Sequence, residues 1–316
     1  MNQESFGYEK NQLFIITAGP TYLDIDAYAC AVSLADLMKL QGKKAIAYSK
    51  ATYNYSVCKS IVTEGQIQRE LPSCFFEKAK YIIVDVSDSN FLEESVPLDR
   101  VVEIYDHHVG YEEYWERRIG NGAHIEFIGC AATLIYREWK KSGLQDKISR
   151  STALLMIAAI LDNTLNLTSS NTTDEDREAF YALCHQAGVG DEFRGEYFSQ
   201  VQSNVEADLK NALINDMKHI GDNMVLPANI AQLCVWDADG IIERLSDIRR
   251  WLDKVSGGWM LNLIDIKHYC GYFICDDIQC QSKLEKIFNV NFHNGIAKLS
   301  KAYLRKQILK NVLSSM

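Results

Sequence analysis

The first half of the chain alternates short apolar runs with longer segments in which apolar residues recur at helical spacing. Residues 13–18, L-F-I-I-T-A, are short, apolar and partly β-branched, as is typical of a buried strand. Residues 27–38 then carry apolar side chains three and four positions apart, and Gly42 is placed to end that helix. Further strands are expected at 44–48, 81–86 and 101–105, and further helices at 131–139 and 151–161. This alternation predicts a doubly wound, mostly parallel α/β sheet, which binds ligands beyond the carboxyl ends of its strands.

The pattern changes in the middle of the chain. The stretch Q-A-G-V-G-D-E-F-R-G-E-Y, residues 186–197, mixes three glycines with charges and has no clear period. We therefore predict a first domain over residues 1–190, a linker over 191–204 and a smaller second domain over 205–316. Within the second domain we expect strands at 230–236, 259–266 and 272–275 and a helix at 246–252, so that this half is α/β as well.

Acidic residues follow most of the expected strands of the first half. Taken alone, an aspartate after a strand is most often a turn or cap residue, and adjacent histidines are most often incidental. In a parallel sheet, however, these strand ends meet at one edge, where the carboxylates would repel one another without a cation. The set comprises Asp24, Asp26, Asp85, Asp106, His107, His108 and, at the end of an apolar helix, Asp162.

This combination of groups favours a centre of divalent metal ions. Carboxylate oxygens together with one or two imidazoles suit Mn²⁺, Mg²⁺ or Co²⁺ better than metals that prefer thiolates. Two such ions, roughly 3.5–4 Å apart and bridged by a carboxylate and a water, are the usual device for phosphoryl transfer. The sequence therefore predicts a two-metal site at the carboxyl edge of the first sheet.

Composition and charge limit the classes of partner. The formal net charge of −9 disfavours extended nucleic acid as a partner, whereas a small polyanion can bind where metals reverse the local field. No apolar run approaches the roughly 20 residues that span a bilayer, and residues 1–10 lack a signal-peptide pattern, so we expect no membrane partner. Nine cysteines without a C-x-x-C pair favour reduced thiols and hence the cytoplasm.

Several stretches resemble the motifs of one family along nearly the whole chain. They are L-D-I-D-A-Y-A (23–29), I-I-V-D (82–85), D-H-H (106–108), E-F-I-G-C-A-A-T (126–133), I-L-D-N-T-L (160–165), N-D-M-K (215–218), N-I-A-Q-L-C-V-W-D (229–237) and R-K-Q-I-L (305–309). In these stretches the sequence resembles the DHH phosphoesterases, and within them the branch of manganese-dependent (family II) inorganic pyrophosphatases, exopolyphosphatases and Prune proteins. The resemblance implies an N-terminal DHH domain, a smaller accessory domain and an active site in the cleft between them.

The resemblance also implies how the metals are held. Asp24 would bind one metal, Asp26 would bind the other, and Asp85 would bridge the two. His107 and Asp162 would complete the second site. Mn²⁺ is the metal that the resemblance favours, with Mg²⁺ or Co²⁺ as alternatives.

Further residues would act on the substrate or on the histidines. By the same resemblance, His108 would face the phosphate, and Asp106 would hold an imidazole in the required tautomer. Lys218, Arg305 and Lys306 would reach the substrate's phosphates from the second domain, with a register uncertainty of one residue at the last motif. The alternative is that Lys218 is an ordinary surface lysine and that the C-terminal segment is an amphipathic helix with a basic face.

The sequence departs from the pyrophosphatase pattern at the first motif. Pro20 stands where those enzymes have a metal-binding histidine, so one site would lose an imidazole and become harder and weaker. Exopolyphosphatases and Prune proteins lack that histidine too. Ala27 replaces a serine, and Asp88 either supplies a substitute oxygen or caps the segment that follows it.

These features lead to three hypotheses on function. The first is a metal-dependent hydrolase of pyrophosphate or short-chain polyphosphate that acts through a metal-bound hydroxide. The second is a Prune-like binding or regulatory protein with weak or no catalysis. The third is a phosphodiesterase of short or cyclic oligonucleotides, which the absence of a G-G-G-H segment disfavours. A homodimer is compatible with each of them.

Overall fold

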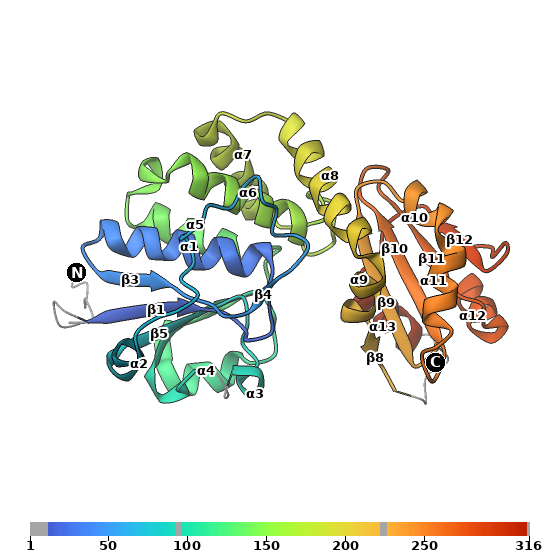
Figure 1. Ribbon diagram of the computed structural model, residues 1–316, viewed down its shortest axis with the longest axis horizontal. Helices are drawn as coiled ribbons and strands as arrows, with labels where there is room; N and C mark the ends of the chain where they lie inside the picture. Colours follow the sequence, from blue (N-terminus) through green and yellow to red (C-terminus); the bar gives the residue numbers. More distant parts are fainter. Residues whose placement is uncertain (1–11, 93–95, 222–225, 315–316) are drawn as a thin grey trace. The chain divides into compact units, whose positions relative to one another are not determined.

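The structure is a computed structural model, and it describes residues 12–92, 96–221 and 226–314 (Figure 1). By its internal contacts the chain divides into two compact units, Met1–Phe193 and Arg194–Met316. The start of the chain, where no signal-peptide pattern is expected, lies outside the described residues. Within the residues that are described, no helix combines the length and the apolar composition required to cross a membrane.

Unit 1 is built on a five-stranded parallel sheet with strand order β3-β1-β5-β6-β7. The strands are β1 (Leu13–Thr17), β3 (Lys44–Ala47), β5 (Lys80–Val84), β6 (Val101–Asp106) and β7 (Ala123–Ile125). The predicted doubly wound parallel sheet is thereby confirmed, with four of its strands at the expected places. The edge strand β7 was not expected, because it has three residues and no apolar run. A separate pair of two-residue strands, β2 (Tyr22–Leu23) and β4 (Thr52–Tyr53), is also parallel.

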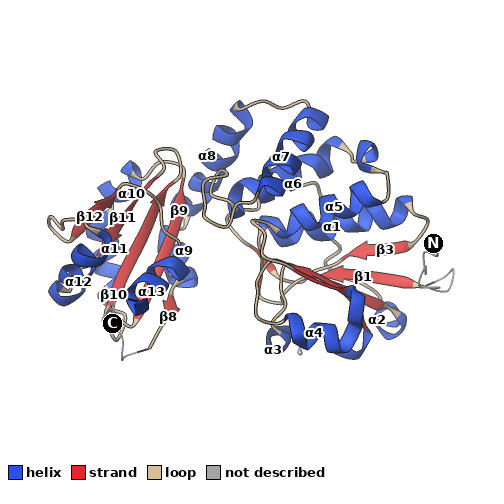
Figure 2. Ribbon diagram, turned by 180° about the vertical axis from the view of Figure 1, so that it is seen from behind, coloured by secondary structure: helices blue, strands red, loops and turns tan. Residues whose placement is uncertain are grey.

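Helices cover both faces of this sheet (Figures 1 and 2). One face carries α1 (Ile25–Leu40), α5 (Ala131–Lys141), α6 (Arg150–Asn163) and α7 (Asp174–Ala187). The other carries α2 (Ser73–Lys78), α3 (Ser89–Leu92) and α4 (Glu112–Ile119). The small residues along α1 let it pack closely against α5 and α6, and nearly all of α1 is buried. The core on the α2–α4 face is centred on Trp115 and the β-branched residues of β1, β5 and β6.

Unit 2 has a mixed five-stranded sheet with strand order β12-β11-β10-β9-β8. Its strands are β8 (Lys218–His219), β9 (Asn229–Val235), β10 (Trp259–Asp265), β11 (Cys270–Ile274) and β12 (Ile296–Leu299). Strands β9 and β10 are parallel, and the other pairs are antiparallel. Its helices are α9 (Leu209–Asp216), α10 (Asp239–Glu243), α11 (Leu245–Leu252), α12 (Ile278–Phe288) and α13 (Arg305–Ser314). The second half is therefore α/β, as expected.

The segment predicted as a linker, residues 191–204, is helical. Helix α8 (Glu192–Ala207) begins just before the division between the units and continues well beyond it. Its buried side chains include Tyr197 and Phe198, and the ring of Phe198 stacks on Trp236 at 5.5 Å between centroids. Tertiary packing of these aromatics outweighs the low helix propensity of Gly195. The domain limits 1–190 and 205–316 stay predictions beside the observed division at residue 193.

Candidate metal centre

The predicted ligands converge at the carboxyl edge of the parallel sheet, where strands β1, β5 and β6 end. Asp85 directly follows β5, and His107 directly follows β6. The Nε2 atom of His107 lies 3.4 Å from Oδ1 of Asp85 and 4.0 Å from Oδ2 of Asp26. Asp24 is close enough to Asp85 for their side chains to share a hydrogen bond when one carboxyl is protonated. Residues from three separate segments therefore point toward one small region.

Two of these ligand atoms are buried without a hydrogen-bond partner. Oδ1 of Asp85 and Nε2 of His107 have none among the described residues, although their side chains are only 5% and 8% exposed. A buried polar atom without a partner costs roughly 1–3 kcal/mol, so such atoms are rare unless a ligand or water completes them. A divalent cation near these two atoms would satisfy both at once. The residues present thus fit the metal site that the sequence predicts.

The position of His107 is set by its other ring nitrogen. Nδ1 of His107 lies 3.2 Å from the carbonyl oxygen of Ile128, a group that can only accept a hydrogen bond. The proton of a neutral imidazole is therefore held on Nδ1, and the lone pair of Nε2 faces Asp85. Metal-binding histidines are usually oriented by such a hydrogen bond.

His108 is held in a different way and faces solvent. One oxygen of Asp106, Oδ1, accepts hydrogen bonds from the amides of His107 and His108 at 2.7 and 3.1 Å, and from Nδ1 of His108 at 2.8 Å. By accepting the hydrogen bond from Nδ1, the carboxylate of Asp106 raises the pKa of His108. Burial opposes ionisation of Asp106, but the hydrogen bond and charge of His108 outweigh it and lower the pKa of Asp106. The side chain of His108 is 62% exposed, so its free Nε2 is available to an anion.

Asp26 is buried completely between two helix N-termini. It lies in the first turn of α1, and its two oxygens accept hydrogen bonds from the amides of Ala131 and Ala132, each at 2.8 Å, at the start of α5. The thiol of Cys30 lies 3.3 Å from Oδ1 of Asp26. The two amides at the N-terminus of α5 thus orient both oxygens of Asp26.

The carboxylates of the centre also repel one another. Burial raises the pKa of Asp85 well above the usual range for a carboxyl, and the charges of Asp24 and Asp26 raise it further. Burial followed by the charge of Asp26 likewise raises the pKa of Asp24, whose Oδ1 caps helix α1 at the amide of Ala27. Asp85 in addition has a left-handed backbone with φ of 58°. Strain of this kind is concentrated at functional sites, and a cation would offset the repulsion.

Asp162 is the remaining predicted ligand. It lies in the last turn of α6, and its charge contributes to raising the pKa of Cys58, which burial chiefly raises to about 12. In the described part of the chain, Asp85, His107 and His108 form one group at this edge, in which a ligand atom of each residue lies within 4.8 Å of those of the other two. The role of Asp162 as a ligand stays a prediction.

The structure also places the residues around the first motif. Pro20 is exposed, and the ring of Phe91 covers the backbone of Gly19 beside it. Asp88, which the sequence left open as a substitute ligand or a cap, accepts a hydrogen bond from the amide of Asn90 at 3.0 Å and so caps the start of α3. Its carboxylate also bonds the hydroxyl of Tyr111. These contacts match those of a cap.

The predicted substrate residues of unit 2 differ in their exposure and in the contacts they already make. Lys218, in β8, and Lys306, in α13, are exposed. The guanidinium of Arg305 is instead bonded to the carboxylate and the carbonyl of Asp216 and to the carbonyl of Ile230, at 2.6–3.2 Å. Arg305 thus fastens the start of α13 to β9 and α9. Sequence reasoning missed this contact, since a basic residue in a basic helix gives no sign of its partner.

A second group of potential ligands lies at the carboxyl ends of β9 and β10. It consists of Asp237, Asp265 and His268. Asp265 is buried and accepts hydrogen bonds from the amide and Nδ1 of His268, and Asp237 is paired with Lys267 at 2.8 Å. These contacts already satisfy the charges, so the group is a hydrogen-bonded turn.

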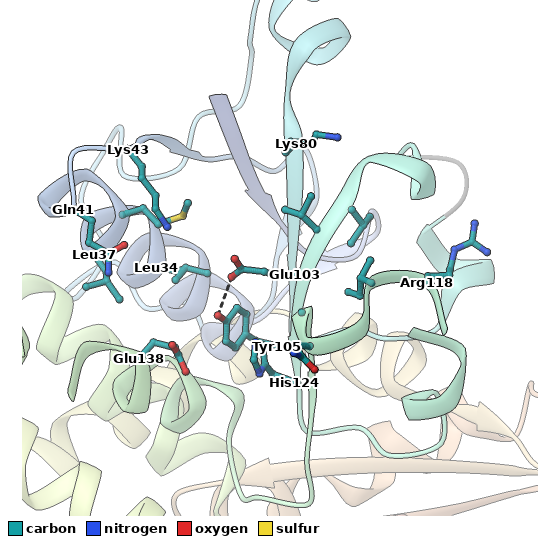
Figure 3. A pocket seen from close by; sticks show the side chains of 16 residues that line it. Leu34, Leu37, Gln41, Lys43, Lys80, Glu103, Tyr105, Arg118, His124 and Glu138 are labelled. Carbon is teal, nitrogen blue, oxygen red and sulfur yellow. Dashed lines mark hydrogen bonds between the residues drawn. The ribbon is translucent and has the colours of Figure 1, made fainter. Parts of the chain in front are cut away.

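The cavity drawn in Figure 3 lies away from the predicted metal ligands. It has a volume of about 540 Å³ and is bordered by the amino ends of β5 and β6, by α1 and by the segment before β7. Inside it the Tyr105 hydroxyl donates to Glu103 at 2.9 Å, and the ring of His124 stacks on Tyr105 at 4.6 Å. The lining residues within the described ranges include none of the predicted ligands.

Known proteins that resemble the chain do so over almost its full length. No family model matches it. A probable manganese-dependent inorganic pyrophosphatase of Staphylococcus haemolyticus (strain JCSC1435) is 27% identical over 299 residues, which cover 90% of this chain and 92% of the relative. The manganese-dependent inorganic pyrophosphatase of Bacillus subtilis (strain 168) is 25% identical, with 95% and 97% covered.

The predicted resemblance is confirmed. Solved structures agree with it at the level of the fold. A putative family II inorganic pyrophosphatase of Methanococcus jannaschii superposes with a TM-score of 0.67 at 19% identity, covering 96% of this chain and 99% of its own. An exopolyphosphatase-related protein of Bacteroides fragilis gives 0.52 at 13% identity, covering 97% and 91%. The chain thus resembles the pyrophosphatase branch in sequence and shares the two-unit α/β fold of these structures.

Proposed function

We propose that the chain is a metal-dependent phosphoanhydride hydrolase that cleaves inorganic pyrophosphate or short-chain polyphosphate. The observation that carries the proposal is the pair of partnerless buried atoms, Oδ1 of Asp85 and Nε2 of His107, that face each other at 3.4 Å. The names of the sequence relatives support the same activity and favour Mn²⁺ as the metal. Divalent ions held there would lower the pKa of a bound water and neutralise the charge of the phosphate oxygens.

The chain's own residues would hold the metals and the phosphate. Asp85 would lie between the two ions, with Asp24 on one side and with Asp26 and His107 on the other. Asp24 caps helix α1 and Asp26 lies in its first turn, so the start of this one helix would carry a ligand for each ion. Asp162, the remaining predicted ligand, is part of the proposal through its motif alone.

His108 would act on the phosphate. Its Nδ1 is held by Asp106, whose hydrogen bond raises the pKa of His108 and so extends the pH range in which the ring is protonated. A protonated Nε2 can donate a hydrogen bond to a phosphate oxygen and a proton to the leaving phosphate. Because the ring is more than half exposed, a substrate can reach it without rearrangement of the strand end.

Unit 2 would supply further positive charge. Lys218 and Lys306 are exposed and free to contact phosphate oxygens as separate point charges. Arg305 would support them by fixing the start of α13, because its guanidinium is already bonded to Asp216.

The experiment that tests the proposal is phosphate release from pyrophosphate, tripolyphosphate and longer chains, with and without Mn²⁺, Mg²⁺ or Co²⁺. We expect Mn²⁺-dependent release that the substitution Asp85→Asn abolishes, since an amide binds divalent metals weakly. Glu113→Gln, which removes an exposed acid of α4, is the matched control and should leave the rate unchanged. A wild-type protein that releases phosphate from none of the three substrates would refute the hydrolase.

One observation favours a second candidate, a binding or regulatory protein with little catalysis. Pro20 offers no ligand atom where the pyrophosphatase pattern has a histidine, and Asp88, the nearby acid, is used as a cap. Metal titration separates the two candidates. A hydrolase of this type needs two ions, whereas a binding or regulatory protein is expected to hold one. A phosphodiesterase of short oligonucleotides gains no support from the site.

Location and assembly are further parts of the proposal. None of the nine cysteines, all of which lie in the described residues, is joined in a disulfide, which supports a reducing compartment such as the cytoplasm. A homodimer stays a prediction, and the molar mass in solution tests it.

A further inference from the structure

Two buried carboxylates bind the loop 129–133, the segment that leads into helix α5 and forms its first turn. Asp26 accepts hydrogen bonds from the amides of Ala131 and Ala132, and Asp176 accepts one from the amide of Gly129. Both aspartates are completely buried. Asp26 is a predicted metal ligand, whereas Asp176, in the first turn of α7, has no predicted role.

Asp176 is bonded to both ends of this loop. Its Oδ2 accepts a hydrogen bond from the amide of Gly129 at 3.0 Å, and its Oδ1 accepts one from the hydroxyl of Thr133 at 2.6 Å. Oδ2 also accepts from the amide and the hydroxyl of Thr173 at 2.8 and 2.7 Å, as part of the capping box of α7. Three donors from the chain thus fill Oδ2 of Asp176. Among the described residues Asp176 belongs to neither group of converging ligand atoms, so we assign it no direct contact with a metal.

The approach of Asp176 to the loop depends on a glycine. A Cβ atom added at Gly129 would lie 2.5 Å from Oδ2 of Asp176 and 2.8 Å from Cγ2 of Thr164. These distances are shorter than real Cβ contacts, so position 129 has no room for a side chain. The backbone can come this close to the carboxylate because position 129 is glycine.

We propose that Asp176 is a positioning residue for the metal centre. By fixing Gly129 and Thr133, it holds the amides of Ala131 and Ala132 in place, and through them both oxygens of Asp26. The inference rests on the proposed function. It adds a residue that affects the affinity of the site for Mn²⁺ through its contacts with Gly129 and Thr133. Hydrogen bonds to a ligating carboxylate orient it, and loss of such outer contacts typically weakens metal binding by about 10- to 100-fold.

The stabilising effect of Asp176 on α7 has to be separated from this role. The capping box would be lost together with the loop contacts in Asp176→Asn, and loss of a cap alone destabilises a helix. Thr133 allows the two to be separated, because its hydroxyl contacts Asp176 but takes no part in the cap. Thr133→Val removes the donor at similar volume, and Thr133→Ser retains it.

The experiment measures the dissociation constants of Mn²⁺ from the free-ion EPR signal during titration of each full-length variant. We expect Asp176→Asn and Thr133→Val to weaken Mn²⁺ binding by about 10- to 100-fold, and Thr133→Ser to retain most of the wild-type affinity. Thr173→Ala is the control for the cap, and it should lower the melting temperature while changing the dissociation constants by less than about 3-fold.

The outcomes separate this inference from the proposed function. Wild-type protein that binds no Mn²⁺ would refute the proposed metal centre and the inference with it. Wild-type protein that binds Mn²⁺, together with a Thr133→Val variant that binds it equally well, would overturn the inference alone. Because Thr133→Val keeps the cap and the volume, this comparison decides the matter even if Asp176→Asn does not fold.

Discussion

Adjacent histidines of the D-H-H triplet have different environments because different acceptors hold their Nδ1 atoms. A backbone carbonyl, that of Ile128, accepts a hydrogen bond from Nδ1 of His107 and leaves its Nε2 turned toward Asp85. A carboxylate, that of Asp106, holds His108 and raises its pKa. The sequence alone gives both residues the same letter, so the distinction at this scale came from the resemblance. The structure now supplies a physical cause for it.

A third histidine, His124, lies away from the predicted metal ligands and makes the stability of the fold depend on pH. It lies in β7 beside the cavity of Figure 3, and burial lowers its pKa below the ordinary value of 6.5. Lys141 acts in the same direction, and the nearby acids Glu138, Glu103 and Glu126 oppose it in part. The unfolded chain therefore takes up this proton at a higher pH than the folded chain does.

From this shift we predict how stability depends on pH. The stability that the neutral ring contributes is present above pH 6.5 and is lost as the pH falls through the lower folded pKa. His124→Phe keeps an aromatic ring against Tyr105 and removes the titration. We expect its melting temperature to fall less than that of the wild type between about pH 7 and about pH 5. Equal falls in the two proteins would contradict the prediction.

Helices and strands were predictable where the apolar pattern was long, and less so where tertiary contacts decide. The runs at β1, β3, β5 and β6 identified the sheet, and their parallel order explains why the acids meet at one edge. Helix α8 was not predicted, because its glycine and mixed charges give no helical period and the burial of its aromatic residues depends on tertiary contacts. The loop 129–133 was noted only as part of a motif, since its contacts with Asp26 and Asp176 join segments far apart in the sequence.

Helix α13 gives a prediction of its own, because Arg305 ties its first residue to Asp216 and Ile230. Arg305→Ala would remove these charged hydrogen bonds and leave Asp216 unpaired, which we expect to lower the free energy of unfolding by about 2–3 kcal/mol. Lys306→Ala is the neighbouring control and should change it by less than about 0.5 kcal/mol. Urea unfolding curves measure both. If Arg305→Ala instead kept its stability and lost only hydrolysis, the arginine would bind substrate rather than fasten the helix.

The whole molecule consists of two units with separate sheets, and the predicted ligands all lie in the first. Residues after 193 contribute no predicted ligand, although they carry Lys218, Arg305 and Lys306. Metal binding is therefore expected to draw on unit 1 alone, and substrate binding on His108 of unit 1 together with basic residues of unit 2. The sequence predicted two domains from the change of pattern, but the place of the division depends on packing along α8.

This division predicts where Mn²⁺ stabilises the protein. At a concentration 100 times the dissociation constant, a ligand of the folded state adds about 2.7 kcal/mol to its stability. We expect amide hydrogen exchange measured by mass spectrometry to slow in unit 1, most of all around the ends of β5 and β6, and to stay nearly constant in unit 2. Equal slowing in both units would mean that metal binding stabilises the two units together.

The thiol of Cys30, 3.3 Å from the carboxylate of Asp26, gives the centre a vulnerability that its oxygen and nitrogen ligands would not predict. Manganese has little affinity for sulfur, so the thiol is harmless to the metal that the protein is proposed to use. A thiophilic ion such as cadmium that entered the same position would find a sulfur within reach and would be retained. We therefore expect inhibition by thiophilic metals, because a cysteine lies one helical turn after the aspartate.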